Sequence, residues 1–369
     1  MTARILIIAG SDSGGGAGIQ ADIKTVTMLG GHAMTAITAV TAQNTIGVQA
    51  VHLVPTEIVI AQIESCVSDI GVDAVKIGMI GSGETTEAVA TYLKRLTVPI
   101  VFDPVMVATS GAALADARTI SAFHSLMAIA SVVTPNLPEV NALGGTMPIL
   151  RHGCHLLLKG GHGDGDEIVD QLLSTSGLIH EIRGLRIDTT STHGTGCTLA
   201  SAVACGLGQG MGIVAAFERA VSFVRMALLE APGLGQGHGP IGQQGVRLDV
   251  GPDMRLNHFV VPLRDYEATR DFYQALGLTL IVDSPSNGYA RFETPGGATL
   301  SIHGDYAGLN FECADLAAQV ARARAAGIAF EGPVEQPWLW QEAWTRDPSG
   351  NRVLLYKAGE NRRFPPWRV

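Results

Sequence analysis

Short apolar runs alternate with amphipathic stretches through the first 230 residues of the chain. Five runs are apolar at most positions, which is typical of strands buried on both faces in a parallel sheet; they are residues 5–9, 74–78, 100–102, 131–133 and 156–158. Between and after them, residues 56–69, 84–96 and 213–230 carry apolar side chains at helical spacing. This alternation predicts an α/β fold, in which helices cover both faces of the sheet.

The pattern changes after a segment rich in Gly, Pro and Gln at 232–252, which we interpret as a linker. Beyond it, residues 256–263 predict a strand and 266–276 a helix, and three short strands follow. A similar series then begins 50 positions later, where Asp265 matches Asp315 and Gly277 matches Gly327. This repeat predicts a second, α+β domain of paired βαβββ units. We place the two domains at residues 1–245 and 254–369.

Composition and charge narrow the functional classes. Of 369 residues, 46% are hydrophobic and 16% charged, which supports sizeable cores and excludes a disordered chain. The net charge is −9 and there is no basic stripe, so nothing favours nucleic acid as a partner. We interpret the pair Arg362-Arg363 near the end as part of a solvated tail.

The five cysteines form no CxxC pair, and their odd number argues against a disulfide framework or a zinc finger. No apolar run approaches the length of a membrane span, and the first ten residues predict a strand rather than a signal peptide. We therefore expect a cytoplasmic protein in a reducing compartment, with no membrane partner.

The strongest chemical signal is the segment 192–197, Thr-His-Gly-Thr-Gly-Cys, directly before a predicted helix at 198–208. Glycines at the start of a helix let backbone N–H groups converge, and the helix dipole adds positive charge there. This predicts an anion hole for a phosphoryl group. A thiol at a helix N-terminus tends to have a lowered pKa, so Cys197 could accept a proton. The plain alternative is a Gly-containing turn with a buried, inert cysteine.

Polar residues also follow three of the predicted strands. Asp103 closes the strand at 100–102, Asn136 and Glu139 follow 131–133, and Lys159 follows 156–158. In open α/β sheets, ligands bind at this carboxyl edge. We therefore predict that Asp103, Asn136 and Glu139 hold Mg²⁺ or its waters and that Lys159 meets a phosphate. Each alone is more often structural, since such residues commonly cap helices.

A Gly-rich segment at 10–22 follows the first predicted strand. The chain contains no G-x-x-x-x-G-K-[ST], which excludes a P-loop kinase, and Ile19 stands where a dinucleotide fingerprint needs glycine. The segment is either a flexible turn or a backbone wall that closes over a small substrate, with Asp22 on the following helix.

Together these motifs closely resemble the hydroxymethylpyrimidine/phosphohydroxymethylpyrimidine kinases of the ribokinase-like superfamily, over about residues 3–242. The most specific matches are 9–12, 16–22, 42–44, 76–79, 134–139, 159–162 and 193–197. The resemblance implies a three-layer ribokinase-like sheet. It also implies phosphorylation, with ATP and Mg²⁺, of 4-amino-5-hydroxymethyl-2-methylpyrimidine and then of its monophosphate to the diphosphate, in thiamine biosynthesis. We expect a homodimer.

Carried over by position, the resemblance implies a role for each matched residue. The pyrimidine pocket is formed by Gly10, Asp22, Gln43, Met79, Val107 and His193, with Gln43 bonded to the aminopyrimidine. Residues 194–197 (Gly194, Thr195, Gly196, Cys197) form the anion hole, with Cys197 nearest to the acceptor oxygen. Asn136, Lys159 and Thr195 contact ATP, and Asp103 and Glu139 bind the metal. Many sugar kinases of the superfamily have Asp where Cys197 stands, so cysteine points to the pyrimidine and pyridoxal branch.

One feature departs from the family pattern. The step from Glu139 to Lys159 is short, so we expect a helix to be trimmed or lost within 142–155 and one face of the sheet to be less covered.

The second region, 254–358, resembles the glyoxalase/bleomycin-resistance/dioxygenase (vicinal oxygen chelate) superfamily through residues 256–261, 271–278 and 347–351. In its metal enzymes, inner-strand side chains bind one divalent ion. His258 matches the first ligand, but the other positions fall on Gly308, Leu354 and near Ser301, with His303 available only in another register. We predict a metal-free ligand cup with aromatic walls from Trp338, Trp340 and Trp344.

Two other functions stay open. A pyridoxal or pyridoxine kinase would use a similar pocket for a flat ring, although Gln43 and Met79 favour the pyrimidine. A regulatory small-molecule-binding protein is the other reading. The set Lys159, Glu139 and Cys197 argues against it for the first domain, and it is the preferred reading for the second.

Overall fold

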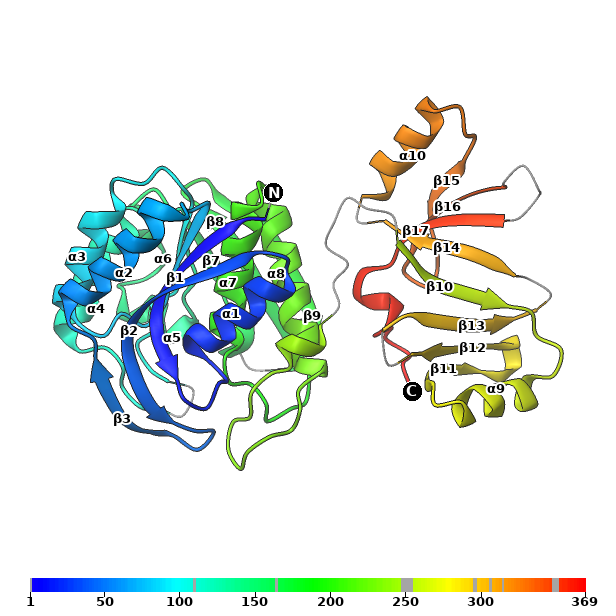
Figure 1. Cartoon of the computed structure of the whole chain (residues 1–369), viewed down its shortest axis with the longest axis horizontal. Helices are drawn as coiled ribbons and strands as arrows, with labels where there is room; N and C mark the ends of the chain where they lie inside the picture. Colours follow the sequence, from blue (N-terminus) through cyan, green and yellow to red (C-terminus); the bar gives the residue numbers. More distant parts are fainter. Residues whose placement is uncertain are drawn as a thin grey trace. The chain divides into compact units, whose positions relative to one another are not determined.

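The computed structural model describes residues 2–108, 111–162, 165–246, 255–294, 297–304, 307–313, 315–346 and 352–369. The chain divides into two compact units, Met1–Val246 and Arg247–Val369, and each is described by itself (Figure 1).

Unit 1 is built on a nine-stranded sheet in the order β3-β2-β1-β4-β5-β6-β7-β8-β9. Strands β1, β2 and β4 to β7 run parallel, β3 is antiparallel to β2, and β8 and β9 form an antiparallel hairpin beside β7. The strands are β1 Arg4–Asp12, β2 His32–Gln43, β3 Val48–Leu53, β4 Ala74–Ile77, β5 Ile100–Phe102, β6 Val132–Val133, β7 His155–Leu158, β8 Glu167–Ser174 and β9 Gly177–Leu185. The five strands predicted from apolar runs are β1 and β4 to β7, whereas the other four were missed.

Helices cover both faces of this sheet, as predicted (Figure 1). On one side lie α1 Gly18–Met28, α7 Thr195–Gly208 and α8 Ile213–Leu229; on the other lie α2 Thr56–Asp69, α3 Gly83–Leu93 and α4 Ala117–Met127. The second group packs its apolar side chains against the sheet, for example where Phe123 of α4 meets Phe102 of β5 edge-on at 5.1 Å between ring centroids. The α/β fold class predicted from the sequence is confirmed.

The segment in which a helix was expected to be lost contains two short helices, α5 Leu137–Ala142 and α6 Thr146–Leu150. Their apolar residues Val140, Ile149 and Leu150 are buried in the same core as α2 to α4. The helical part of this segment is therefore trimmed rather than lost, and the buried residues of the two short helices contribute to the cover of this face.

The composition of the segment after α8 suggested a free linker, but the structure shows a packed segment. Up to Val246 it packs onto unit 1, where Ile241 and Gln243 have no exposed surface. A Cβ on Gly237 would lie 2.2 Å from the carbonyl oxygen of Thr45, and one on Gly242 1.9 Å from that of Glu230. The glycines here permit close backbone contact rather than flexibility.

Unit 2 holds an eight-stranded mixed sheet in the order β11-β12-β13-β10-β14-β17-β16-β15. Its elements are β10 Arg255–Val261, α9 Tyr266–Ala275, β11 Thr279–Ser284, β12 Tyr289–Glu293, β13 Thr299–His303, β14 Gly308–Glu312, α10 Leu316–Ala325, β15 Glu331–Glu335, β16 Gln341–Arg346 and β17 Arg352–Lys357. The predicted repeat is visible at the helices, whose N-caps Asp265 and Asp315 each accept a hydrogen bond from the backbone N–H three residues on. The motif at 347–351 lies outside the described residues.

The end of unit 2 contradicts the prediction of a solvated tail. Arg362 and Arg363 are only 4% and 8% exposed, because they pair with Glu312 and Glu293. Trp340 likewise does not form an open wall: it is buried and stacks on Tyr356 with ring centroids 4.5 Å apart. Among the helices in the described part of the chain, none has the length and apolar content needed to cross a membrane.

Candidate active site

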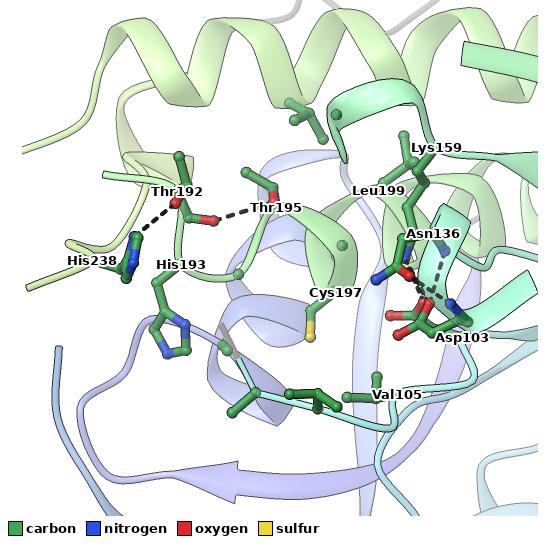
Figure 2. A pocket seen from close by; sticks show the side chains of 18 of the residues that line it. Asp103, Val105, Asn136, Lys159, Thr192, His193, Thr195, Cys197, Leu199 and His238 are labelled. Atoms are coloured by element: carbon green, nitrogen blue, oxygen red, sulfur yellow. Dashed lines mark hydrogen bonds and ion pairs between the residues drawn. The ribbon is translucent and has the colours of Figure 1, made fainter. Parts of the chain in front are cut away.

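A cavity of about 930 Å³ opens at the carboxyl ends of the parallel strands of unit 1. Its walls include all but one of the residues predicted from the sequence: Gly10, Gln43, Met79, Asp103, Val107, Asn136, Glu139, Lys159, His193, Gly194, Thr195, Gly196 and Cys197. The exception is Asp22. Figure 2 shows the Cys197 sulfur lying between His193 on one side and the group of Asp103, Asn136 and Lys159 on the other.

The Gly-rich segment after β1 is an ordered wall, because Asp12 organises it. The Asp12 carboxylate accepts hydrogen bonds from the backbone N–H groups of Gly14, Gly16 and Ala17, at 2.8, 3.1 and 2.8 Å. Burial favours the neutral carboxyl, but the hydrogen bonds from His193 and these amides outweigh it and lower the pKa of Asp12. The flexible-turn alternative is therefore excluded.

His193 connects this wall to Gln43. Its Nε2 lies 2.9 Å from Oδ2 of Asp12 and 3.2 Å from the side-chain amide nitrogen of Gln43. Its backbone N–H donates to the Gly239 carbonyl oxygen at 3.0 Å, so the segment after α8 also holds it. Asp12 thus orients the imidazole, which stands next to the Gln43 amide at the cavity.

The anion-hole segment enters α7 three residues earlier than predicted. The helix begins at Thr195, and its N-cap Gly194 has φ 89°, a left-handed conformation that favours glycine. A Cβ there would lie 1.9 Å from the carbonyl oxygen of Gly16. This close contact sets the start of α7 against the Gly-rich wall. The first-turn N–H groups of the helix therefore face the cavity edge at which Thr195, Gly196 and Cys197 lie.

The expected lowering of the Cys197 pKa is wrong. The side chain opens partly into the cavity, but the protein surrounds the sulfur, and this burial raises the pKa of the thiol to about 11. The Lys76 ammonium acts in the opposite direction, whereas the carboxylates of Asp22 and Asp103 add to the rise. Desolvation of a thiolate is the largest of these effects and decides the direction of the shift.

Asp22 lies beneath the cavity rather than in its wall. Its side chain has no exposed surface, one oxygen lies 2.8 Å from Lys76 Nζ, and the other accepts from Ser201 Oγ at 2.7 Å. Lys76 itself is a cavity residue that the sequence reasoning missed. Burial disfavours its charge, but Asp22, Cys197 and Asp103 outweigh burial and raise the pKa of Lys76. A lysine in the middle of a buried strand was the available signal, because such a lysine needs a partner.

On the opposite side, Lys159 lies between two carboxylates. Its Nζ is 2.9 Å from Asp103 Oδ1 and 4.0 Å from Glu139 Oε2 (Figure 2). Burial lowers the pKa of Lys159, but the two carboxylates outweigh it and raise the pKa, so the ammonium is charged at neutral pH. A Cβ on Gly196 would lie 3.2 Å from this Nζ, which places the cation directly beside the start of α7.

Glu139 and Asn136 also cap α5. The backbone N–H of Glu139 donates to the Asn136 side chain at 2.9 Å, and the Glu139 carboxylate accepts from the Asn136 N–H at 2.8 Å. The structural reading of these residues therefore holds in part. The same capping box keeps the Glu139 carboxylate within reach of Lys159, so the cap positions a charge at the cavity.

Away from Gln43 and Met79, the cavity continues as an apolar slot that the sequence reasoning missed. It runs between the β8–β9 hairpin, α7 and α8, and it is lined by Ile168, Ile182, Ile187, Leu199, Val221, Val224 and Leu228. Arg183, Arg186 and Arg225 lie along its edge. The slot was missed because β8 and β9 were not predicted as strands.

The comparisons with known proteins agree with this geometry. Residues 12–242 match the family model of phosphomethylpyrimidine kinase, and residues 255–355 match the glyoxalase/bleomycin resistance protein/dioxygenase superfamily. The hydroxymethylpyrimidine/phosphomethylpyrimidine kinase of Rhizobium meliloti is 46% identical over 258 residues, which is 65% of this chain and 97% of that protein. The enzyme of the same name from Streptomyces coelicolor is 45% identical and covers 64% of this chain and 93% of its own length.

Solved structures show the same fold in unit 1. The pyridoxal kinase of Bacillus subtilis, determined with ADP, superimposes with a TM-score of 0.62 at 32% identity and covers 68% of this chain and 100% of its own. A phosphomethylpyrimidine kinase from Clostridium difficile gives a TM-score of 0.53 at 36% identity, covering 61% of this chain and 99% of its own. The pyridoxal kinase of Staphylococcus aureus, at 29% identity and TM-score 0.61, was solved with an ATP analogue, AMP-PCP, and pyridoxal; it covers 66% of this chain and 95% of its own.

The sheet, the cavity at its carboxyl edge and the lysine between two carboxylates define a kinase of the pyridoxal-kinase-like fold. The chain belongs to the phosphomethylpyrimidine kinase family, with a glyoxalase-like second unit. Unit 1 is accordingly a hydroxymethylpyrimidine/phosphomethylpyrimidine kinase of thiamine biosynthesis. The roles of its single residues remain predictions.

Proposed function

We propose that unit 1 transfers the γ-phosphoryl group of ATP first to the hydroxymethyl oxygen of the aminopyrimidine and then to the monophosphate so formed. The pyrimidine lies against Gly10, Gln43 and Met79, and the nucleotide lies in the apolar slot beside α8. The observation that supports this assignment most directly is the Lys159 ammonium beside Gly196. A cation and a helix N-terminus thus lie together between the two ends of the cavity.

The donor set near Lys159 fits Mg²⁺. Asp103 and Glu139 provide two carboxylates, and the described residues contain no cluster of three or more His, Cys, Asp or Glu side chains that could hold a metal alone. Mg²⁺ commonly takes one or two protein carboxylates and fills its remaining positions with water and substrate phosphates. When bound, it would neutralise charge on the phosphates. Lys159 and the first-turn amides of α7 hold the transferring group in line with the acceptor.

The two transfers differ in whether they need Cys197 as a base. In the first, an alcohol loses its proton as the oxygen–phosphorus bond forms, and a positioned base contributes about 10²- to 10⁴-fold to such a step. In the second, the acceptor is a phosphate oxygen whose second pKa is about 6, so it is already largely ionised at neutral pH. We assign to Cys197 the removal of the alcohol proton in the first transfer, by the small thiolate fraction that its raised pKa leaves.

ADP release from the purified chain tests the function. The acceptors are hydroxymethylpyrimidine, its monophosphate, pyridoxine and ribose, each with ATP and Mg²⁺. We expect hydroxymethylpyrimidine to be the best first acceptor, because a site built to pair with an amine rejects rings that lack it. Faster turnover of pyridoxine would favour the alternative that the acceptor is a pyridoxal-like ring. This alternative stays open because two of the similar solved structures are pyridoxal kinases.

We propose a homodimer, a cytoplasmic location and, for unit 2, a metal-free ligand-binding role. Its His258 supports the last point. It is buried, its Nδ1 lies 2.8 Å from Thr299 Oγ1, and its ring meets Trp340 edge-on. Burial, with the nearby charges of Arg291 and Arg362, keeps the pKa of His258 well below its ordinary value, so the ring is neutral and contained within the packing.

A further inference from the structure

One face of the unit 2 sheet is polar although it is buried. Across four neighbouring strands, Glu293 of β12 is the register partner of Thr299, Thr299 of His258, and His258 of Asn310 in β14. Register partners share a face, and Glu312, two residues after Asn310, lies on that face as well. All five side chains are at most 8% exposed. A row of this kind is not the core of a sheet, which is ordinarily apolar.

The end of the chain covers this row. The 3₁₀ turn Gly359–Arg362 and the residues after it lie beside the sheet (Figure 1). Arg362 Nε donates to Glu312 Oε2 at 3.1 Å, and its Nη1 donates to the Gly297 carbonyl oxygen at 2.7 Å. Arg363 Nε donates to Glu293 Oε1. Each of these two guanidinium groups thus pairs with a buried carboxylate, and the two carboxylates lie on the same face of the sheet.

Stability alone does not account for these pairs. Replacing both partners of a buried ion pair by apolar side chains of similar volume is often neutral or stabilising, so a tail and a sheet that only had to pack together could carry apolar groups at both positions. Two buried polar atoms also have no hydrogen-bond partner among the described residues: Asn310 Oδ1, in the polar row, and Trp340 Nε1, whose ring contacts His258 of that row. An acceptor and a donor left without a partner along this face are features of a ligand site rather than of a finished core.

The Glu312 site does not depend on the tail for its shape. The Glu312 carboxylate also accepts from the Asn257 side-chain amide at 2.7 Å, and Asn257 Oδ1 accepts from the Tyr356 hydroxyl at 2.7 Å. These residues belong to β10, β14 and β17 of the sheet itself. The stacked rings of Tyr356 and Trp340 stand beside the site. The guanidinium of Arg291 already lies over the Trp340 ring, 4.6 Å from its centroid, so this pair of rings accepts a planar nitrogen cation.

We propose that this face of unit 2 is a binding site for planar nitrogen cations of the guanidinium and amidinium class, which Arg362 and Arg363 of the same chain occupy as built-in ligands. A carboxylate matches the N–H groups of such a cation in geometry as well as charge. A small ligand of this class gains access when the tail leaves, and the tail returns when the ligand is absent. The site is separate from the kinase cavity and does not take part in phosphoryl transfer.

The test uses a chain that ends at Ala358 and a synthetic peptide of residues 359–369. Titration calorimetry should show one peptide bound per trimmed chain and none to the intact chain. A peptide with citrulline at 362 and 363 has the same shape without the charge, and it should bind at least about 30-fold more weakly, because removing one partner of a buried charge pair has costs of that order. Agmatine, a small guanidinium compound, should displace the natural peptide.

Equal binding of the citrulline peptide would overturn the proposal, and so would failure of millimolar agmatine to displace the natural peptide. If the trimmed chain does not fold, the full-length variant Arg362→Ala/Arg363→Ala decides the matter, because it keeps the rest of the tail. It should bind agmatine, and the further change Glu312→Gln should abolish that binding. Absence of agmatine binding to the double variant would equally overturn the proposal. Unchanged kinase activity in each variant checks that unit 1 is intact.

Discussion

The ammonium of Lys76 lies 2.8 Å from the carboxylate of Asp22, and neither side chain has any exposed surface. Lys76 of β4 lines the cavity and Asp22 of α1 lies beneath it, with Ser201 of α7 bonded to the second carboxylate oxygen. Three elements of unit 1 therefore meet at one buried charge pair, and its ammonium is the cation that opposes the rise of the Cys197 pKa.

Lys76→Met should destabilise unit 1 strongly, because it leaves the Asp22 carboxylate buried without a cation to pair with. Breaking a buried pair from one side typically costs about 3–5 kcal/mol, whereas replacing both partners is often close to neutral. Lys76→Met/Asp22→Leu should therefore be more stable than the single variant. Urea unfolding of unit 1 followed by circular dichroism measures both. Equal loss of stability in the two variants would show that the pair is not the source of the effect.

The pH dependence of the first transfer should differ from that of the second. The Cys197 thiol has a pKa of about 11, so the thiolate fraction rises about tenfold per pH unit between pH 7 and 9. The first transfer should speed up accordingly in single-turnover measurements, while the second stays nearly level.

Cys197→Ala should slow the first transfer much more than the second and remove the rise of the first transfer rate with pH. Cys205→Ala, in the same helix but away from the cavity wall, is the matched control. A wild-type pH profile in Cys197→Ala would end the assignment of Cys197 as base.

Lys159→Met should damage both transfers to a similar degree. The ammonium is charged and lies beside the start of α7, where it can meet the transferring phosphoryl group whatever the acceptor. Loss of one such electrostatic contact costs about 10²- to 10³-fold in rate. Single-turnover rates of each step measure this, with the exposed Lys94→Met as the control. A loss confined to one step would contradict a role shared by both transfers.

Gly194→Ala should abolish both transfers, because the new Cβ would lie 1.9 Å from the Gly16 carbonyl oxygen and would push α7 away from the Gly-rich wall. Gly210 is a matched control: its φ is 83°, close to the 89° of Gly194, but no atom lies within 4 Å of the Cβ position. Gly210→Ala therefore carries the same left-handed strain without the collision. Both variants are assayed for ADP release and for secondary structure. A similar loss of activity in the two variants would mean that backbone strain, not contact with Gly16, sets the need for glycine at 194.

The sequence predicted the fold class because the central strands of unit 1 are apolar on both faces, as in Ile5 to Ile8. The hairpin β8–β9 was missed because its strands are not buried on both faces. Most of its side chains are at least partly exposed, and its polar residues, such as Asp170 and Arg183, interrupt any apolar run. The apolar slot of the cavity was missed with it.

Most predicted site residues line one cavity because they follow successive strands of a single sheet. The charges beneath that cavity could not be placed in the same way. An aspartate on an amphipathic helix ordinarily faces water. Only the packing of α1 against β1 and β2 shows that Asp22 points inward, where it meets Lys76 of β4. Arg362 was misjudged for a similar reason, since its partner Glu312 stands 50 positions earlier and no local pattern connects them.

The segment that follows α8 has a consequence for how the protein is made. His238 donates its backbone N–H to Thr45, Gly239 accepts from His193, and the Gln243 side chain donates to Thr198. The last residues of unit 1 to leave the ribosome therefore secure residues that left it long before. A nascent chain that stops short of Gln243 has its strands but lacks these closing contacts. Unit 2, translated next, keeps the growing chain attached while this segment emerges from the exit tunnel, so the kinase can complete its cavity before synthesis ends.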